Sequence, residues 1–302
     1  MDETTDSRPR GGVAGALLRS LRPAQWVKNL FVLVPLVFAH RLDRLDLSLQ
    51  AFTAFLAFCA ASSAVYLLND LRDRESDRNH PLKRLRALAA GHLGAGTALA
   101  AAGVLLALAA LASFRLAAPF AWVLAAYVML NVLYSLGLKR VVILDVMSIA
   151  AGFVLRVLAG AVAIQVEVSS WLLLCTTFVA LFLGFSKRRH ELATLPPGGL
   201  GTRAVLDQYN LPFLDQVINV VTASTVVAYS LYTVDSATAA RLGTPHLVWT
   251  VPLVLFGIFR FLYLLYRKLD ARSPTDAILH DPPFLLNLLL WGATVVVLIY
   301  VV

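Results

Sequence analysis

The sequence is organised around residues 48–77, which read SLQAFTAFLAFCAASSAVYLLNDLRDRESD. The first part, residues 48–68, contains no charged residue, and as a helix it is long enough to cross the roughly 30 Å hydrocarbon core of a bilayer. The last part, residues 69–77, is dominated by Asp, Glu and Arg. The stretch therefore predicts a transmembrane helix with a densely charged segment where the chain leaves the membrane.

Three acidic residues of this segment share one helix face. Asp70, Asp73 and Asp77 follow the spacing i, i+3, i+7, and Asn69 lies one turn before Asp73. Close carboxylates repel one another unless a cation lies between them, and Mg²⁺ takes oxygen ligands and shares its coordination shell with substrate phosphates. We therefore predict that Asn69, Asp70, Asp73 and Asp77 are catalytic residues that bind Mg²⁺. The alternative is a solvated loop of mixed charge.

Basic residues are interleaved with these acids and continue beyond them. They are Arg72, Arg74, Arg78, Lys83, Arg84 and Arg86. Carboxylates that hold a metal, beside cations that contact phosphate oxygens, are the components of a diphosphate-binding site. Within this group, we predict substrate contacts for Arg72, Arg78 and Lys83.

The composition places the chain in a membrane. Of its 302 residues, 59% are hydrophobic and 15% are charged, and the mean hydropathy is +0.75. A soluble domain is nearer to about 45–50% apolar and about 25% charged. The formal net charge of +8 is not taken as a sign of nucleic-acid binding, because its meaning depends on where the charges lie. Cys59 and Cys175 lie within apolar runs and are expected to be small core residues.

Nine apolar segments predict an all-α, polytopic membrane protein with nine transmembrane helices. The segments are residues 26–39, 49–68, 95–114, 119–136, 141–164, 170–185, 213–234, 247–266 and 284–302. With a cytoplasmic N-terminus, twenty of the 26 Lys and Arg residues fall on the cytoplasmic side and four on the other. The positive-inside rule therefore predicts a multi-pass protein of the inner (plasma) membrane whose charge-rich connections face the cytoplasm. Residues 1–20 are predicted to be a disordered cytoplasmic tail, and residues 21–302 a single transmembrane domain.

A second cytoplasmic connection opens with four potential cations in a row. Lys187, Arg188 and Arg189 are followed by His190 and Glu191. Taken alone, such a run is a positive-inside anchor; opposite an acidic cluster it favours contacts to phosphate oxygens, because Arg forms forked hydrogen bonds. Glu191 is expected to orient an arginine or to add a metal ligand. We predict that Lys187, Arg188, Arg189 and Glu191 belong to the substrate site.

Polar residues elsewhere are expected at the same membrane face. Tyr134, Lys139 and Arg140 end the fourth segment, and Lys28 begins the first. Tyrosine is common at membrane interfaces, which is the simpler interpretation of Tyr134; the alternative is that all four contact substrate phosphates.

Two charged residues lie within the fifth segment. Asp145 and Arg156 are eleven residues apart, close to three helical turns, so they face the same way. Charges inside a span usually face a cavity or a partner. The alternatives are an ion pair with another helix, a polar cavity wall that includes Arg156 in the substrate site, and the mid-membrane site of a secondary transporter. The sequence contains no GxxxxGK[ST] loop for ATP, no zinc-type Cys/His spacing and no GxSxG motif.

The charged segment resembles the first signature of the UbiA superfamily of intramembrane prenyltransferases, NDxxDxxxD. Asn69, Asp70, Asp73 and Asp77 match it residue by residue, and Tyr134 and Lys139 resemble the family's element at the end of the fourth span. The resemblance covers the whole chain and implies a nine-helix bundle with catalytic cytoplasmic loops after the second and sixth spans. It also implies binding of Mg²⁺ and a diphosphate.

The second loop differs from that of the aromatic prenyltransferases, because basic residues replace its Asp-rich motif. With the opening LRPAQWVKN at 21–29 and the SPTD at 273–276, this loop resembles the decaprenyl-phosphate phosphoribosyltransferase branch. That branch implies transfer of 5-phosphoribose from 5-phosphoribosyl 1-diphosphate to a polyprenyl phosphate lipid, with release of pyrophosphate, for arabinan and cell-wall precursor synthesis. The alternatives are prenyl transfer from a prenyl diphosphate to a small aromatic acceptor and, less favoured, secondary transport. Oligomeric state, including a homo-oligomer, is left open.

Overall fold

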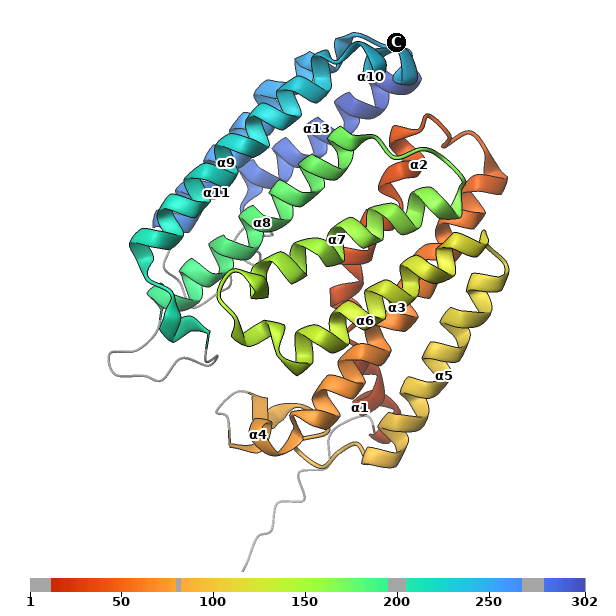
Figure 1. Cartoon of the computed structure of the whole chain (residues 1–302), viewed down its shortest axis with the longest axis vertical. Coiled ribbons are helices and arrows are strands. Elements are labelled where there is room, and N and C mark those ends of the chain that lie inside the picture. The colour runs from red at the N-terminus through yellow and green to blue at the C-terminus, as the bar shows by residue number, and fades with distance from the viewer. Residues whose placement is uncertain (1–11, 80–82, 195–204, 268–279, 302) are drawn as a thin grey trace, which may run out of the picture.

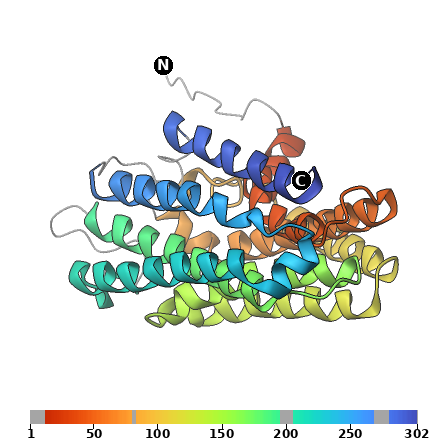
Figure 2. The same cartoon turned by 90° about the horizontal axis from the view of Figure 1, so that it is seen from above.

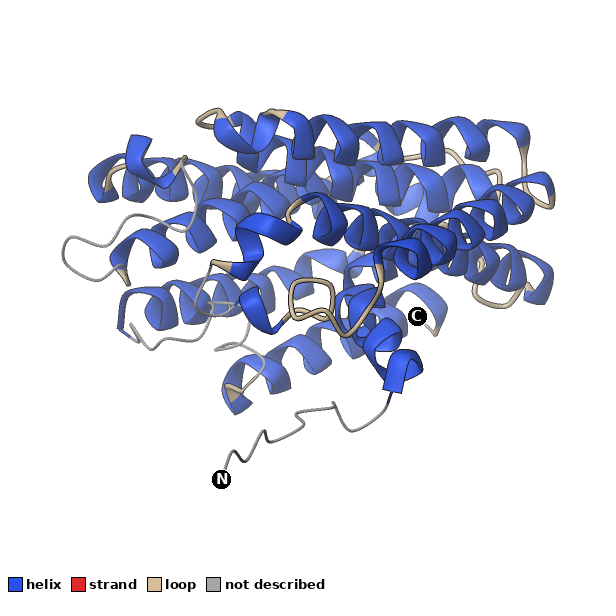
Figure 3. Cartoon of the chain, turned by 90° about the horizontal axis from the view of Figure 1, so that it is seen from below, coloured by secondary structure: helices blue, strands red, loops and turns tan. Residues whose placement is uncertain are grey.

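The computed structural model describes residues 12–79, 83–194, 205–267 and 280–301, which form helices joined by turns and loops and contain no strand (Figure 3). The α-helices are α1 (Gly12–Leu21), α2 (Val34–Phe38), α3 (Leu45–Arg72), α4 (Arg74–Arg78), α5 (Ala95–Phe114), α6 (Ala118–Leu136), α7 (Leu144–Ala163), α8 (Ser170–Ala193), α9 (Leu211–Val234), α10 (Ser236–Leu242), α11 (Val251–Arg267) and α13 (Pro282–Tyr300). Five 3₁₀ segments connect them: η1 (Pro23–Val32), η2 (Lys83–Leu85), η3 (Leu138–Arg140), η4 (Leu206–Gln208) and η5 (His246–Thr250). The prediction of an all-α membrane protein is confirmed.

Eight helices in the described residues are long and apolar enough to cross a membrane: α3, α5, α6, α7, α8, α9, α11 with η5, and α13. The predicted first span, residues 26–39, is not a continuous α-helix, so the count of nine transmembrane helices is not confirmed by the described residues. It consists of η1 and α2, because Arg22 adopts a left-handed conformation (φ 55°) and Pro23 and Pro35 follow. The tail prediction is also wrong for residues 12–20, which belong to α1 and bury Ala16 and Ser20.

The charge-rich connections gather at one end of the bundle. Figure 1 places α4 near the bottom of the bundle, and the turn between α6 and α7 and the start of α9 on its left side. It places α2, α10 and the C-terminus at the opposite end, and Figure 2 shows the long helices lying side by side. We call the α4 end the acidic end. The described parts of these charged connections therefore lie toward the same end of the bundle.

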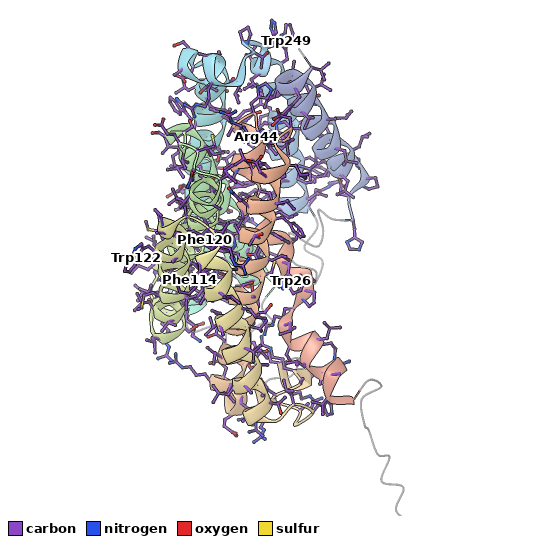
Figure 4. All side chains as sticks on the ribbon, turned by 90° about the vertical axis from the view of Figure 1, so that its right-hand side faces the viewer. Trp26, Arg44, Phe114, Phe120, Trp122 and Trp249 are labelled. Atoms are coloured by element: carbon purple, nitrogen blue, oxygen red, sulfur yellow. The ribbon has the colours of Figure 1, made fainter. Side chains whose placement is uncertain are left out.

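Helix α3 lies at the centre because its buried face carries small side chains. Ala54, Ala57, Ala61 and Ala64 are buried, and α3 packs along α5 and against α6, α7 and η1. Small residues let transmembrane helices approach closely. The outer surface is apolar, and Figure 4 shows Trp122 projecting away from the bundle. Its position suits contact with lipid.

The η1 segment is held against α7 at a glycine. An added Cβ at Gly160 would lie 1.8 Å from the carbonyl oxygen of Val32 and 3.2 Å from Cδ of Pro35. Only hydrogen at this position allows the two backbones to approach. The contact therefore fixes η1, and with it Lys28 and Asn29, against the centre of the bundle.

Gly160→Ala is expected to destabilise the protein by about 1–3 kcal/mol, because backbone has to move to admit the methyl group. The measurement is the midpoint of thermal unfolding in detergent. Gly103→Ala on α5 is the matched control: nothing lies within 4 Å of its added Cβ, and alanine is the better helix former. Equal midpoints for the two variants would contradict the close contact.

Candidate active site

The acidic motif lies on a nearly continuous helix at the acidic end. The Asp73 amide donates to the Asn69 carbonyl (2.9 Å), and the Asp77 amide donates to the Asp73 carbonyl (2.8 Å). Helix α4 therefore continues the helical path of α3 past Asp73. Asp70 and Asp77 are buried, whereas Asp73 is partly exposed. Along this path the carboxylates of Asp70 and Asp77 share Arg86 as a partner, whereas Asp73 pairs with Lys139.

Two arginines neutralise the buried acids. The Arg22 guanidinium lies 2.5 Å from Asp70 Oδ1, and Arg86 bridges Asp70 (3.1 Å) and Asp77 (2.7 Å). Arg22 also lies over the Tyr66 ring, 4.9 Å from its centroid. Neither arginine was assigned to the site from the sequence. The sequence shows that both arginines lie in charged stretches. It does not show that they pair with Asp70, because a pairing across 48 or 16 residues leaves no periodic pattern in the sequence.

The segment at the end of α6 lies against Asp73 and Asn69. Lys139 Nζ lies 3.6 Å from Asp73 Oδ2, and the Ser135 hydroxyl donates to Asn69 Oδ1 (2.7 Å). Sequence placed Lys139 at this face and overlooked Ser135, which is a buried hydroxyl among interfacial residues. The structure thus brings the cytoplasmic end predicted for α6 onto the motif.

The chemistry of the donor set suits Mg²⁺. Asn69, Asp70, Asp73 and Asp77 offer carboxylate and amide oxygens, the ligands that this hard cation prefers. In the described part of the chain no three His, Cys, Asp or Glu side chains are assembled as a metal cluster. Arg86 instead supplies the positive charge between Asp70 and Asp77. A metal at these oxygens would take over the neutralising role of that guanidinium.

The three basic residues at the end of α8 point in three directions, because consecutive helical residues are rotated by about 100°. Arg188 is 1% exposed and pairs with Asp145 (2.6 Å) and Glu191 (2.7 Å). Arg189 pairs with Asp215 (2.5 Å) and stacks on Tyr266, with its Cζ 4.1 Å from the ring centroid. Lys187 is exposed and lies within electrostatic range of Lys28.

These contacts revise the predicted roles in the second loop. The guanidinium of Arg188 pairs with two carboxylates, those of Asp145 and Glu191. Glu191 orients this arginine, one of its two expected roles. Lys187 is the member of the run that lies near Lys28 of η1.

Arg156 is buried and bonded to neutral groups. Its guanidinium donates to Asn29 Oδ1 (2.8 Å), the Gly152 carbonyl (2.8 Å) and the Tyr127 hydroxyl (2.9 Å). It also lies over the Tyr127 ring, 4.7 Å from the centroid. Among the residues described, no carboxylate pairs with it. The positive charge of Arg156 is therefore retained inside the bundle.

Asp145 and Arg156 do not form one site. Asp145 binds Arg188 and the Tyr209 hydroxyl, whereas Arg156 is bonded around Asn29 and Tyr127. The ion pair with another helix applies to Asp145, and the transporter site loses its structural basis. Of these two residues, Arg156 is the one without a carboxylate partner among the described residues.

Lys28 extends this positive region toward the acidic motif. It lies within electrostatic range of Lys187, Arg156 and Arg22. Its ammonium group has no hydrogen-bond acceptor in the part of the chain that the structure describes, and its side chain is exposed. Like charges so arranged favour binding of an anion. We call Lys28, Arg156 and Lys187 the inner cations.

The remaining predicted substrate-site residues are exposed or partly buried. Arg72 and Arg140 are exposed, and Arg78 pairs with Glu75 (3.1 Å) and donates to the Ala89 carbonyl (3.3 Å). Lys83 and Tyr134 are partly buried, and Tyr134 lies within electrostatic range of Arg188. The stretch at 273–276 lies outside the described residues. Among the described residues, the partners of Arg78 are therefore Glu75 and Ala89, not the acids of the motif.

The chain is similar to known proteins over most of its length. The model of the UbiA prenyltransferase family matches residues 30–289. The chain is 32% identical to "Decaprenyl-phosphate phosphoribosyltransferase" of Mycolicibacterium smegmatis, over 99% of this chain and 96% of the relative. It is 32% identical to the protein of the same name from Corynebacterium glutamicum, over 100% and 92%.

Solved structures share the fold. A UbiA homologue from Archaeoglobus fulgidus bound to DMAPP and Mg²⁺ matches with a TM-score of 0.71 at 20% identity, over 95% of this chain and 100% of that one. A digeranylgeranylglyceryl phosphate synthase matches with a TM-score of 0.65 at 15% identity, over 94% and 98%. The chain is thus a multi-pass membrane transferase that belongs to the UbiA prenyltransferase family.

Proposed function

We propose that the protein transfers 5-phosphoribose from 5-phosphoribosyl 1-diphosphate to a polyprenyl phosphate, decaprenyl phosphate in the named relatives, and releases pyrophosphate. The observation that carries the proposal is the excess of cations around one acidic motif: Arg22 and Arg86, Lys139, and the inner cations. Full-length similarity to proteins named for this reaction supports the same substrates.

The substrates bring three anionic groups to one site. These are the donor diphosphate, the donor 5-phosphate and the phosphate of the lipid. One carboxylate–metal cluster neutralises the diphosphate alone, so further cations are needed for the other two groups. A prenyl diphosphate with a small aromatic acceptor brings fewer phosphates, and for it the buried charge of Arg156 would lack an anion. This count favours the phosphoribosyl donor.

The acidic motif would receive the diphosphate. Asn69, Asp70, Asp73 and Asp77 would hold Mg²⁺, which stabilises negative charge on a leaving pyrophosphate. Arg22 and Arg86, now paired with Asp70 and Asp77, would turn to phosphate oxygens as charge-assisted donors. Lys139 would contact the same group beside Asp73.

The transfer itself needs little acid–base chemistry. An oxygen of the lipid phosphate bonds to C1 of the ribose while the C1–O bond to the diphosphate breaks, and that electron pair leaves with pyrophosphate. The lipid phosphate is already anionic at neutral pH, so no general base has to remove a proton. The protein would contribute positioning and a field that favours the developing charges.

The proposed orientation places the acidic end in the cytoplasm of the producing cell. The excess of Lys and Arg in the connections at this end supports it. A water-soluble donor would enter from that side, and the polyprenyl tail would remain among the membrane helices. The product would then serve arabinan and cell-wall precursor synthesis.

The deciding experiment offers the purified protein two labelled donors with Mg²⁺. One reaction contains 5-phosphoribosyl 1-diphosphate and polyprenyl phosphate; the other contains a prenyl diphosphate and a small aromatic acceptor. Pyrophosphate release and a labelled lipid in the first reaction alone are the expected result. Turnover of the prenyl diphosphate alone would replace this proposal by the alternative.

Lys28→Met is expected to lower kcat/KM for the phosphoribosyl donor at least about tenfold, because a charge-assisted contact to phosphate is removed. The comparison is with Arg84→Met, which removes an exposed cation from the first loop. Steady-state kinetics with saturating lipid gives both values. Equal, small effects of the two substitutions would remove Lys28 from the phosphate site.

A further inference from the structure

The turn between α6 and α7 contains a strained residue. Ile143 has φ 70° and ψ −48°, and the Leu144 amide donates to the Val142 carbonyl (2.8 Å) across it. This is close to the classic γ-turn, which is rare and strained, and a β-branched side chain is a poor fit to positive φ. Such a conformation persists only where its surroundings enforce it.

Tyr209 supplies that restraint. Its hydroxyl accepts a hydrogen bond from the Ile143 amide (2.7 Å) and donates one to Asp145 Oδ1 (2.7 Å). Burial, together with the Asp145 carboxylate, raises the pKa of the Tyr209 phenol, so the hydroxyl keeps the proton it donates. Next to it, the Gln208 side chain donates to the Arg140 carbonyl (3.4 Å). Both contacts join the segment before α9 to the turn.

The restraint is itself anchored. Asp145 is fully buried, and its second oxygen lies 2.6 Å from Arg188, which also pairs with Glu191. Tyr209 is therefore bonded to a carboxylate that is held by the end of α8. The turn, α8 and the segment before α9 form one connected network.

The same turn contains Lys139, which contacts Asp73 of the acidic motif. Lys139 lies four residues before Ile143 and reaches Asp73 at 3.6 Å. We propose that Tyr209 is a positioning residue: it holds the turn at residues 138–143 so that Lys139 stays opposite Asp73. The inference rests on the proposed function only in taking Lys139 and Asp73 as active-site residues.

The first test measures the tether without any substrate. Hydrogen exchange of residues 138–145 is compared in the purified wild type, Tyr209→Phe and Tyr229→Phe. The Tyr229 hydroxyl is also buried and bonded twice, to Thr250 (2.6 Å) and Trp291 (3.0 Å), at the other end of the bundle. Tyr209→Phe is expected to raise exchange in the turn about tenfold or more, and Tyr229→Phe to leave it unchanged. Unchanged exchange in Tyr209→Phe would overturn the proposal.

The second test asks whether Tyr209 acts through Lys139. The affinity for Mg²⁺–pyrophosphate is measured in a double-mutant cycle of Tyr209→Phe and Lys139→Met. Tyr209→Phe is expected to weaken binding about tenfold in the wild type and less than about twofold when Lys139 is already replaced. Equal loss in both backgrounds would overturn the proposal.

The probe keeps the two claims separate. Pyrophosphate is released from either candidate donor, so the cycle does not depend on which donor is correct. A protein that ignores 5-phosphoribosyl 1-diphosphate but shows the expected coupling refutes the proposed function and leaves the role of Tyr209 standing. Turnover of that donor with an additive cycle supports the proposed function and refutes the role of Tyr209.

Discussion

Replacing Asp73 with asparagine is expected to lower turnover at least about a hundredfold while leaving the protein folded. Asp73 is the most accessible acid of the motif: its side chain is 38% exposed, and its one ion pair with a described residue, Lys139, is long at 3.6 Å. Losing its charge therefore leaves no buried partner unpaired. The substitution removes the proposed metal ligand and little else.

The matched control is Glu75→Gln, which neutralises another acid of the same segment. Glu75 is 79% exposed and, among the described residues, pairs with Arg78, so its loss should leave turnover near that of the wild type. Turnover and the midpoint of thermal unfolding are measured for both variants. A fully active Asp73→Asn protein would remove this residue from the metal site and weaken the assignment of the whole motif.

Arg188→Met is expected to destabilise the protein by about 3–5 kcal/mol, because it leaves the buried carboxylate of Asp145 without its cation. Glu191 loses the same partner. The measurement is the midpoint of thermal unfolding in detergent. Asp145→Asn in the same chain should restore part of the loss, since a neutral amide no longer needs a counter-charge.

Arg189→Met serves as the comparison, since its partner Asp215 is more exposed and remains hydrated when the arginine is gone. Its effect on the midpoint should be clearly smaller. If Arg188→Met instead unfolds like the wild type and raises only the KM of the phosphoribosyl donor, Arg188 is a phosphate ligand as its sequence context suggests. The two substitutions thus separate structural from substrate-binding arginines in one experiment.

The parts of the site that sequence predicts are those with a local pattern. The i, i+3, i+7 spacing of Asp70, Asp73 and Asp77 is a property of one helix, and the grouping of basic loops follows from counting charges along the chain. Both need no knowledge of neighbouring helices. The resemblance to the UbiA superfamily rests on the same segment, because the NDxxDxxxD motif directly after a transmembrane helix is a specific signature.

What sequence does not predict depends on contacts between distant segments. Lys187, Arg188 and Arg189 look equivalent in a row, yet which one is buried depends on Asp145, which lies on a different helix. The pairing of Arg22 and Arg86 with Asp70 likewise follows from how η1 and the first loop fold back. The break in the first span was hidden because apolar content does not register the left-handed backbone at Arg22.

The buried guanidinium of Arg156 imposes an order on biogenesis. A helix presenting a bare arginine near its centre enters lipid at a cost of about 2.5–3.5 kcal/mol on translocon scales. In the folded bundle the Arg156 guanidinium donates a hydrogen bond to Asn29, which is synthesised more than a hundred residues earlier. The N-terminal segment is therefore already available when α7 leaves the ribosome. We expect that chains lacking it would retain α7 at the translocon or expose it to membrane quality control.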